Sequence, residues 1–296
     1  MSSRPNKGAH RRALGQNFLT DHRLAARIAT SLDATPEPVV ELGAGSGVIT
    51  HELAALGRPV TAVEIDPQWT ERLCRVPGVH VVRCDMRRFR HPRYPHVVVG
   101  NLPYGITTAV TRRLLAEPSW TDAVLLMQWE VARKRASGRS LLNAQWSPWY
   151  EFRLMQRVPA AAFQPVPSVD GGLVRISRRH RALVPGDELG EYQRFVKAVF
   201  TGRGRGLAEI VRQLCRKQEI PGHSVHVPAR LAHALPADLD ARDWARVWSE
   251  FTATRRQRPV EAASSRRRAS AKRAGPRSRR RARPDVGPRQ ARDRPE

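Results

Sequence analysis

Four consecutive residues have the chemistry to hold a nucleobase by its exocyclic amine: Asn101, Leu102, Pro103 and Tyr104. An adenine N6 nitrogen is a poor nucleophile because its lone pair is delocalised into the ring. The Asn101 side-chain oxygen and the Leu102 carbonyl could accept from its two N–H bonds, with Pro103 stiffening the turn. Tyr104 offers a flat face on which an extruded base can stack. The alternative is an ordinary strand-ending turn, because Asn and Pro are common turn formers.

The tetrapeptide follows residues 96–100, whose β-branched side chains predict a strand buried inside a parallel sheet. The four residues therefore lie just beyond the carboxyl end of a strand. In open α/β sheets this edge is where ligands bind.

A glycine-rich turn over 43–47 joins a short predicted strand, 39–42, to a predicted helix. Glycines in such a turn let the backbone approach a ligand closely. Their spacing is GxGxG, and Val48 stands where the dinucleotide-binding pattern GxGxxG has its last glycine. The turn therefore favours a nucleoside without pyrophosphate.

Acidic residues stand at the ends of the next two predicted strands. Glu64, in the strand over 60–65, has the separation from Gly43 at which an acidic residue accepts bonds from ribose hydroxyls. Asp85 follows the strand over 79–83 and is suited to accept from an adenine amino group. A helix or turn cap is an equally good interpretation of Asp85.

A polar segment near the start of the chain could also close over a ligand. Gln16 and Asn17 precede Phe18 at the entry to a predicted helix. An ordinary helix entry with a hydrophobic contact also explains this pattern.

Prolines stiffen a loop over 163–170, between strands predicted over 151–158 and 172–176. Phe163, which begins this loop, could sandwich an extruded base against Tyr104. The alternative interpretation is a core residue beneath the loop.

The net charge of +25 predicts a polyanionic partner, nucleic acid before anionic membrane. A genome-wide bias toward arginine could explain part of it, because lysine is rare. The start of the chain lacks a secretory pattern, and no apolar run approaches the roughly 20 residues of a membrane span. The three cysteines have no metal-binding spacing and fit a reducing cytoplasm. We therefore expect a cytoplasmic protein without a metal or a membrane partner.

The element pattern changes along the chain and predicts three regions. Residues 1–178 alternate strands and helices, and residues 179–254 contain helices with a flexible basic turn, 202–206, as a candidate RNA contact. Residues 255–296 are of low complexity, with 16 Lys or Arg and four acidic residues, and are expected to be disordered. We expect this tail to attract phosphates in a salt-sensitive way, although a solvating tail without function is also possible.

In this order, GQNFL, ELGAGSG, VEID, a strand-end Asp, NLPY and FxPxPxVD resemble the ribosomal RNA adenine N6-methyltransferase family. That family includes the erythromycin-resistance (Erm) methyltransferases and the KsgA-type dimethyladenosine transferases. The resemblance covers roughly residues 11–254. It implies an α/β fold with a Rossmann-like seven-stranded sheet, an antiparallel last hairpin, and a small C-terminal helical domain.

The resemblance also implies S-adenosylmethionine as cofactor and assigns site residues by position. Asn101, Leu102, Pro103 and Tyr104 are expected to orient the target adenine, with Phe163 on its other face. Gly105 and Gly171 depart from the residues usual in the family. The residues expected to contact the cofactor are Gln16, Asn17, Leu19, Gly43, Gly45, Glu64, Ile65, Asp85 and Asn101.

Several segments are similar to actinobacterial Erm proteins, namely 121–126, 128–135, 138–141, 146–152 and the arginine-rich tail. This similarity predicts methylation of one adenine in 23S rRNA, with resistance to macrolides, lincosamides and streptogramin B. We expect a monomer that acts on unassembled large subunits by direct in-line methyl transfer, without a metal or a covalent enzyme intermediate. The alternatives are KsgA-type dimethylation of adjacent adenines in 16S rRNA and a non-catalytic RNA-binding assembly factor. The lack of a sizeable target-recognition domain disfavours a DNA methyltransferase.

Overall fold

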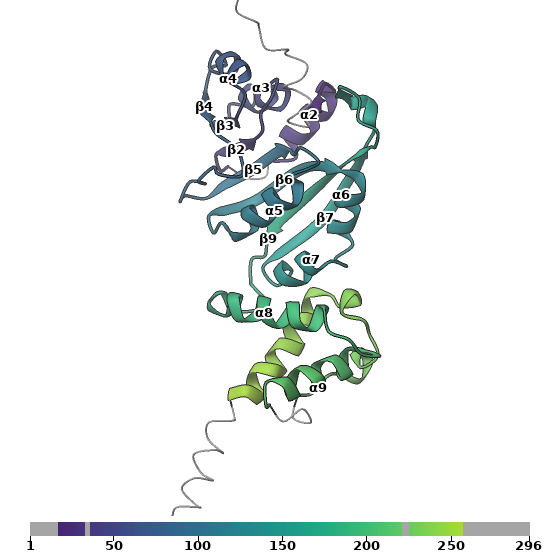
Figure 1. Cartoon of the computed structure of the whole chain (residues 1–296). Coiled ribbons are helices and arrows are strands. Elements are labelled where there is room, and N and C mark those ends of the chain that lie inside the picture. Colours follow the sequence, from purple (N-terminus) through teal and green to yellow (C-terminus); the bar gives the residue numbers. More distant parts are fainter. Residues whose placement is uncertain (1–16, 33–35, 221–224, 257–296) are drawn as a thin grey trace, which may run out of the picture.

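The computed structural model describes residues 17–32, 36–220 and 225–256. Within these ranges, a seven-stranded sheet dominates the fold (Figure 1). Its strands are β2 (Val39–Leu42), β3 (Val60–Glu64), β4 (Val79–Arg83), β5 (His96–Asn101), β6 (Trp120–Gln128), β7 (Tyr150–Val158) and β9 (Gly171–Arg178).

The strand order in space is β4-β3-β2-β5-β6-β9-β7. β9 is antiparallel to both of its neighbours, β6 and β7, whereas the other neighbouring pairs are parallel. The order reverses between β2 and β5, because the chain builds outward through β3 and β4 and then returns. Such a reversal leaves a crevice at the carboxyl ends of the strands. The α/β fold with an antiparallel last hairpin is confirmed.

Helices follow most strands and cover both faces of the sheet (Figure 1). α2 is capped by Asp21, whose side chain accepts from the Leu24 backbone N–H at 3.0 Å. The helices of this part of the chain are α2 (His22–Thr30), α3 (Val48–Ala55), α4 (Pro67–Leu73), α5 (Thr107–Ala116), α6 (Trp129–Ala136) and α7 (Leu141–Trp146).

Alternating valines of β5 face two apolar layers. Val97 and Val99 belong to the cluster that includes buried residues of α2 and α3, whereas Val98 belongs to the cluster that includes α5 and α7. Both faces of this central strand are therefore buried, as expected for a parallel strand with helices on both sides.

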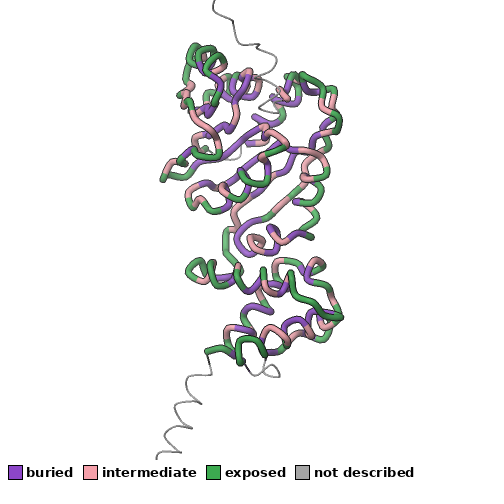
Figure 2. The backbone as a smooth tube through the Cα atoms, in the orientation of Figure 1, coloured by how far each residue is buried: buried purple, intermediate pink, exposed green. Residues whose placement is uncertain are grey.

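The C-terminal region consists of α8 (Leu189–Phe200), α9 (Leu207–Lys217) and a helix over 241–256. Each of its helices has buried apolar residues (Figure 2), and these belong to the same apolar cluster as residues of the sheet. The Tyr192 ring contacts Trp149 and Trp248, and its hydroxyl donates to the Ala144 carbonyl at 2.7 Å. The helices and the sheet therefore share one core.

Several strands differ from their predicted bounds: β3, β5 and β7 by one residue each, and β6 and β9 by more. The sequence also predicts a strand over 123–127, and in the structure this strand, β6, begins three residues earlier because its pairing with β5 extends to Trp120. β9 extends two residues further than predicted because it pairs with both β6 and β7. No helix of the described ranges is both long enough and apolar enough to cross a bilayer. Gln16 and residues 257–296 of the predicted tail lie outside the described residues.

Candidate active site

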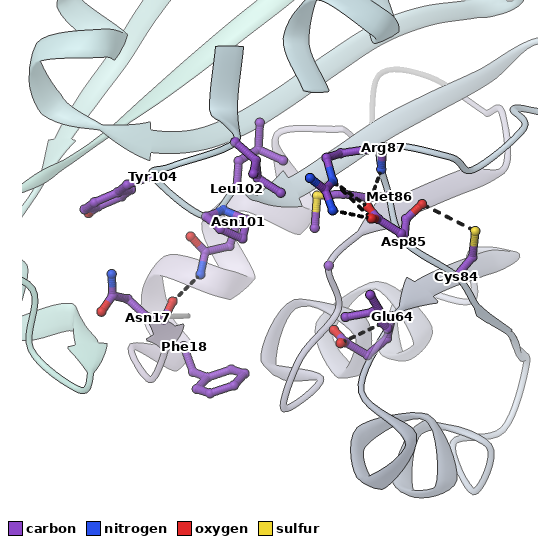
Figure 3. Close-up of a pocket in the computed structure, with 14 residues that line it drawn as sticks. Asn17, Phe18, Glu64, Cys84, Asp85, Met86, Arg87, Asn101, Leu102 and Tyr104 are labelled. Carbon is purple, nitrogen blue, oxygen red and sulfur yellow. Dashed lines mark hydrogen bonds and ion pairs between the residues drawn. The ribbon is translucent and has the colours of Figure 1, made fainter. Parts of the chain in front are cut away.

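One pocket lies at the carboxyl ends of β2, β3, β4 and β5 (Figure 3). It therefore occupies the crevice that the reversal of strand order creates. The residues that line it are Asn17, Phe18, Gly43, Glu64, Ile65, Cys84, Asp85, Met86, Arg87, Asn101, Leu102, Pro103, Tyr104 and Ile106. The predicted NLPY tetrapeptide and the predicted acidic residues thus meet around one cavity.

Two glycines of the turn after β2 have a left-handed backbone and close neighbours. Gly43 has φ +73°, and a Cβ there would lie 2.5 Å from the Met86 Cε atom. Gly45 has φ +54°, and its Cβ would lie 2.8 Å from the Phe18 ring. A side chain at either position would be strained by the left-handed backbone and would have to push a neighbour aside, so glycine is strongly favoured. Gly43 lines the pocket, whereas the Gly45 N–H donates to Glu64 at 2.8 Å.

Glu64 ends β3 with its carboxylate held by backbone groups. One oxygen accepts from the N–H of Gly45, and the other accepts from the N–H groups of Ile65 and Asp66, each at 2.8 Å. The side chain is buried but lines the pocket. These three donors fix the orientation of the carboxylate and leave acceptor capacity for a ligand hydroxyl. Ile65, which is 43% exposed, forms an apolar part of the wall.

Asp85 lies two residues beyond β4 and is bonded to Arg87 (Figure 3). The Arg87 guanidinium donates to both carboxylate oxygens, with the shortest distance 2.6 Å from Nη2 to Oδ2. The Arg87 side-chain hydrogen bond is the largest cause that holds the pKa of Asp85 below its usual value. Asp85 is thus an ionised acceptor at the wall of the pocket.

The Asn101 amide is oriented by a residue 84 positions earlier in the chain. Its Nδ2 donates to the Asn17 carbonyl at 2.7 Å (Figure 3). A carbonyl oxygen can only accept, so the amide nitrogen must face Asn17 and the amide oxygen must face away from it. The Leu102 N–H donates to the Leu126 carbonyl of β6 at 2.9 Å, which fixes the next peptide.

Tyr104 stands at the far end of the tetrapeptide, after Pro103, whose carbonyl accepts from the Ile106 N–H. The Tyr104 ring is partly exposed and lines the pocket. Its hydroxyl is buried and has no hydrogen-bond partner among the described residues. Burial, with a smaller contribution from Asp170, raises the pKa of Tyr104. The ring is available for stacking, and its hydroxyl stays protonated at neutral pH.

The sequence predicts that Phe163 stacks on the target base opposite Tyr104, but in the structure it is buried away from the pocket. β1 (Phe18–Leu19) pairs antiparallel with β8 (Phe163–Gln164), and this pairing places Leu19 opposite Phe163. Both side chains are buried in one apolar cluster, and Phe163 is only 1% exposed. Neither residue lines the pocket. The alternative interpretation, a core residue beneath the proline loop, describes Phe163 here.

Five residues that the sequence interpretation did not assign also line the pocket. Met86 and Phe18 abut the glycine turn, and Arg87 covers Asp85. Cys84 and Ile106 complete the wall. The only sequence signal for these five residues is that each lies within two positions of Asn17, Asp85 or Tyr104. No cluster of metal-ligating side chains occurs within the described ranges.

A second buried acid lies beneath the glycine turn. Glu41 of β2 is 2% exposed, and its carboxyl accepts from the Thr50 hydroxyl at 2.5 Å. Burial raises its pKa to about 8, so it is largely protonated at neutral pH.

The lining fits S-adenosylmethionine. The two carboxylates, Glu64 and Asp85, suit a ribose and an adenine amine, while Ile65 and Met86 offer apolar contacts to a purine ring. The Gly43 backbone allows close approach, and Asn101 links this part of the pocket to Tyr104.

Comparison with known proteins identifies the family. A family profile described as ribosomal RNA adenine dimethylase matches residues 8–250. The mycinamicin-resistance protein MyrB of Micromonospora griseorubida is 48% identical over 247 residues, covering 80% of this chain and 78% of MyrB. An rRNA adenine N-6-methyltransferase of Corynebacterium diphtheriae is 46% identical over 211 residues, covering 70% of this chain and 83% of that protein.

A solved structure of a related enzyme supports the same family assignment. The 23S rRNA methyltransferase ErmE superposes with a TM-score of 0.68 at 35% identity, covering 79% of this chain and 99% of that chain. A dimethyladenosine transferase from Plasmodium falciparum, at 18% identity and TM-score 0.66, has the same fold. The chain therefore belongs to the ribosomal RNA adenine dimethylase family and is an S-adenosylmethionine-dependent rRNA adenine N6-methyltransferase.

Proposed function

We propose that this enzyme methylates N6 of a single adenine in 23S rRNA and so confers resistance to macrolides, lincosamides and streptogramin B. The observation that carries this proposal is the 48% identity to a mycinamicin-resistance protein over most of both chains. Similarity to a small-subunit rRNA methyltransferase of Thermotoga neapolitana is weaker, at 32% over 209 residues. The structural similarity to ErmE supports the same choice.

The proposed cofactor contacts follow from the pocket. Glu64 accepts from the ribose hydroxyls, Asp85 accepts from the adenine amine, and the Gly43 backbone lies against the nucleoside. When bound, S-adenosylmethionine supplies a methyl group on a positively charged sulfur. Asn101 extends from this site toward Tyr104, where we place the target base.

The proposed role of the tetrapeptide is to orient the target amine. The Asn17 carbonyl holds the Asn101 amide nitrogen, so the amide oxygen is the group left to accept an N6 proton. The Leu102 carbonyl accepts the second proton, and the Tyr104 ring stacks on the base. These contacts favour in-line attack by positioning rather than by a strong base, because the N6 proton becomes acidic as the new bond forms.

The test is methyl transfer from labelled S-adenosylmethionine to unmodified 23S and 16S rRNA, followed by mapping of the modified base. We expect label on one 23S adenine. Label confined to adjacent 16S adenines would instead assign the KsgA-type function. Absence of label on both RNAs, with RNA binding retained, would favour a non-catalytic assembly factor.

Asn101→Ala tests the site within the same assay. We expect a loss of transfer of about a hundred-fold or more, because the oriented acceptor is removed. RNA binding and the melting temperature should change little. Transfer at the wild-type rate would contradict the role proposed for Asn101.

We further propose that the enzyme acts as a monomer on large-subunit RNA before assembly. Comparison of protein-free 23S rRNA with intact large subunits tests the substrate state. Efficient methyl transfer only to intact large subunits would contradict action before assembly. Sedimentation of the enzyme alone and with RNA reports the oligomeric state.

A further inference from the structure

The Asp85 carboxylate is engaged by its neighbour two residues on. Its Oδ1 accepts from the Arg87 backbone N–H at 2.8 Å and from Nε at 3.1 Å. Its Oδ2 accepts from Nη2 at 2.6 Å and from Nε at 3.0 Å. The Arg87 side chain folds back over the carboxylate and forms part of the pocket wall (Figure 3).

These contacts leave one acceptor position on Asp85. A carboxylate offers about four lone-pair sites. Arg87 donates three protons to them: the backbone N–H, one Nη2 proton, and the Nε proton, which is shared between the two oxygens. When the shared Nε proton settles on one oxygen, one lone-pair site becomes free for an amine while the guanidinium stays in place.

The two side chains differ in exposure. Asp85 is 16% exposed, whereas Arg87 is 54% exposed. A two-point guanidinium contact fixes the plane of a carboxylate more firmly than a single donor does. The plane of the Asp85 carboxylate, and so the direction of its remaining lone pair, is set by Arg87.

We propose that Arg87 is a positioning residue for cofactor recognition, which aims the free Asp85 lone pair at the adenine amine and so selects adenine over purines with a 6-oxo group. The inference rests on the proposed contact between Asp85 and the adenine amine. In this proposal Arg87 stays bonded to Asp85 when the cofactor is bound. The opposite role, a competitor that the cofactor must displace, predicts the opposite sign for removal of Arg87.

The experiment measures binding of S-adenosylhomocysteine and of its hypoxanthine counterpart, S-inosylhomocysteine, to the full-length chain by calorimetry. The variants are Arg87→Ala, Arg87→Lys and Asp85→Ala. Arg90→Ala is the matched control, because Arg90 is exposed on the same segment and makes no bond to Asp85 among the described residues.

For Arg87→Ala we expect about ten-fold weaker binding of S-adenosylhomocysteine and a similar drop in preference over the inosine compound. Arg87→Lys should be intermediate, because an ammonium is a point charge that cannot bond both oxygens in plane. Arg90→Ala should match the wild type. Tighter binding by Arg87→Ala would establish the competitor and overturn the proposal.

Asp85→Ala distinguishes the proposed Asp85 contact from the positioning role of Arg87. If it leaves binding and preference unchanged, the proposed contact of Asp85 with the cofactor is wrong, and the role of Arg87 falls with it. If Asp85→Ala weakens binding but Arg87→Ala does not, only the positioning role is overturned.

A pH profile adds a readout that a purely structural role would not move. Since Arg87 holds the pKa of Asp85 low, binding by the wild type should weaken only in acid. In Arg87→Ala this loss should begin at a higher pH. An unshifted profile would contradict the proposal.

Discussion

At the residue scale, three carboxyl groups around the glycine turn differ because their surroundings differ. Glu64 accepts from three backbone N–H groups, and Asp85 is paired with Arg87. Glu41 is buried with the Thr50 hydroxyl as its donor, and its pKa rises to about 8. Glu41 is therefore a neutral part of the scaffold, whereas Asp85 is an ionised ligand-binding group.

Glu41→Gln should remove a pH-dependent loss of stability. The folded pKa of about 8 lies above the unfolded value of 4.5, so the unfolded chain releases the proton first as pH rises. Wild-type stability from this group is complete below pH 4.5 and is lost as pH rises to about 8. Between pH 5 and pH 8.5, we expect the free energy of unfolding of the variant to rise relative to that of the wild type by on the order of 3 kcal/mol.

Chemical denaturation across this pH range measures the difference. Glu71→Gln is the control, because Glu71 is exposed and the substitution makes the same change from carboxyl to amide. Parallel pH curves for wild type and Glu41→Gln would contradict a protonated Glu41.

His91 should give the opposite dependence in acid. Its Nδ1 lies 3.0 Å from the His96 Nε2, and burial, followed by the neighbouring His96, lowers the pKa of His91 to about 4. The unfolded chain therefore binds a proton first as pH falls below 6.5, and stability is lost between pH 6.5 and about 4.

His91→Gln should reduce the loss of unfolding free energy between pH 6.5 and pH 4 by on the order of 2 kcal/mol. Thermal melts at closely spaced pH values test it, and His80→Gln serves as an exposed control. A variant that loses as much stability in acid as the wild type would show that His91 is not the responsible group.

At the element scale, the turn over 202–206 between α8 and α9 owes its glycines to close packing. A Cβ on Gly202 or Gly204 would lie 2.5 or 2.9 Å from Ile210. A Cβ on Gly206 would lie 2.6 Å from the Ala232 carbonyl oxygen. The sequence predicts a flexible basic turn here, whereas the structure shows that packing requires its glycines. Arg203 and Arg205 of this turn are exposed.

Gly206→Ala should destabilise the protein by about 1 to 3 kcal/mol, because the new methyl group meets backbone atoms that cannot rotate away. Gly186→Ala is the matched control, since its Cβ would have no neighbour within 4 Å. Denaturant midpoints compare the two variants. Equal midpoints would contradict the prediction, because they would show that the backbone of residues 232–233 can move to make room for the methyl group without loss of stability.

At the scale of the whole molecule, basic residues outnumber acidic ones, and the net charge is +25. Residues 257–296 hold 14 Lys or Arg and four acidic residues, and lie outside both the described structure and the family match. Charge on such a segment attracts phosphates without reading sequence. We therefore expect the tail to raise affinity for rRNA without selecting the methylated base.

Removal of residues 257–296 should weaken rRNA binding and lower its salt dependence, by roughly 0.7 to 0.9 in log–log slope for each lost phosphate contact. Binding isotherms across salt concentrations measure the slope, and base mapping should give the same adenine. Replacement of Arg266, Arg267 and Arg268 by Lys keeps the charge and should leave the slope unchanged. A changed target base would contradict a purely electrostatic role.

The sequence by itself determined the sheet and the place of the pocket. The valines of 97–99 and the glycine turn over 43–47 predict their own local structure, because backbone and burial preferences act over a few residues. Glu64, Asp85 and the NLPY tetrapeptide lie at or just after the carboxyl ends of parallel strands, so their meeting at one sheet edge follows from topology.

The tertiary structure decided which side chains face the ligand and in what state. Phe163 is buried because β8 pairs with β1, a contact across more than half the catalytic region. The Asn101 amide takes its orientation from the distant Asn17 carbonyl, and Glu41 takes its protonation state from burial. These properties depend on long-range packing and on the loss of solvent, neither of which a local sequence pattern encodes.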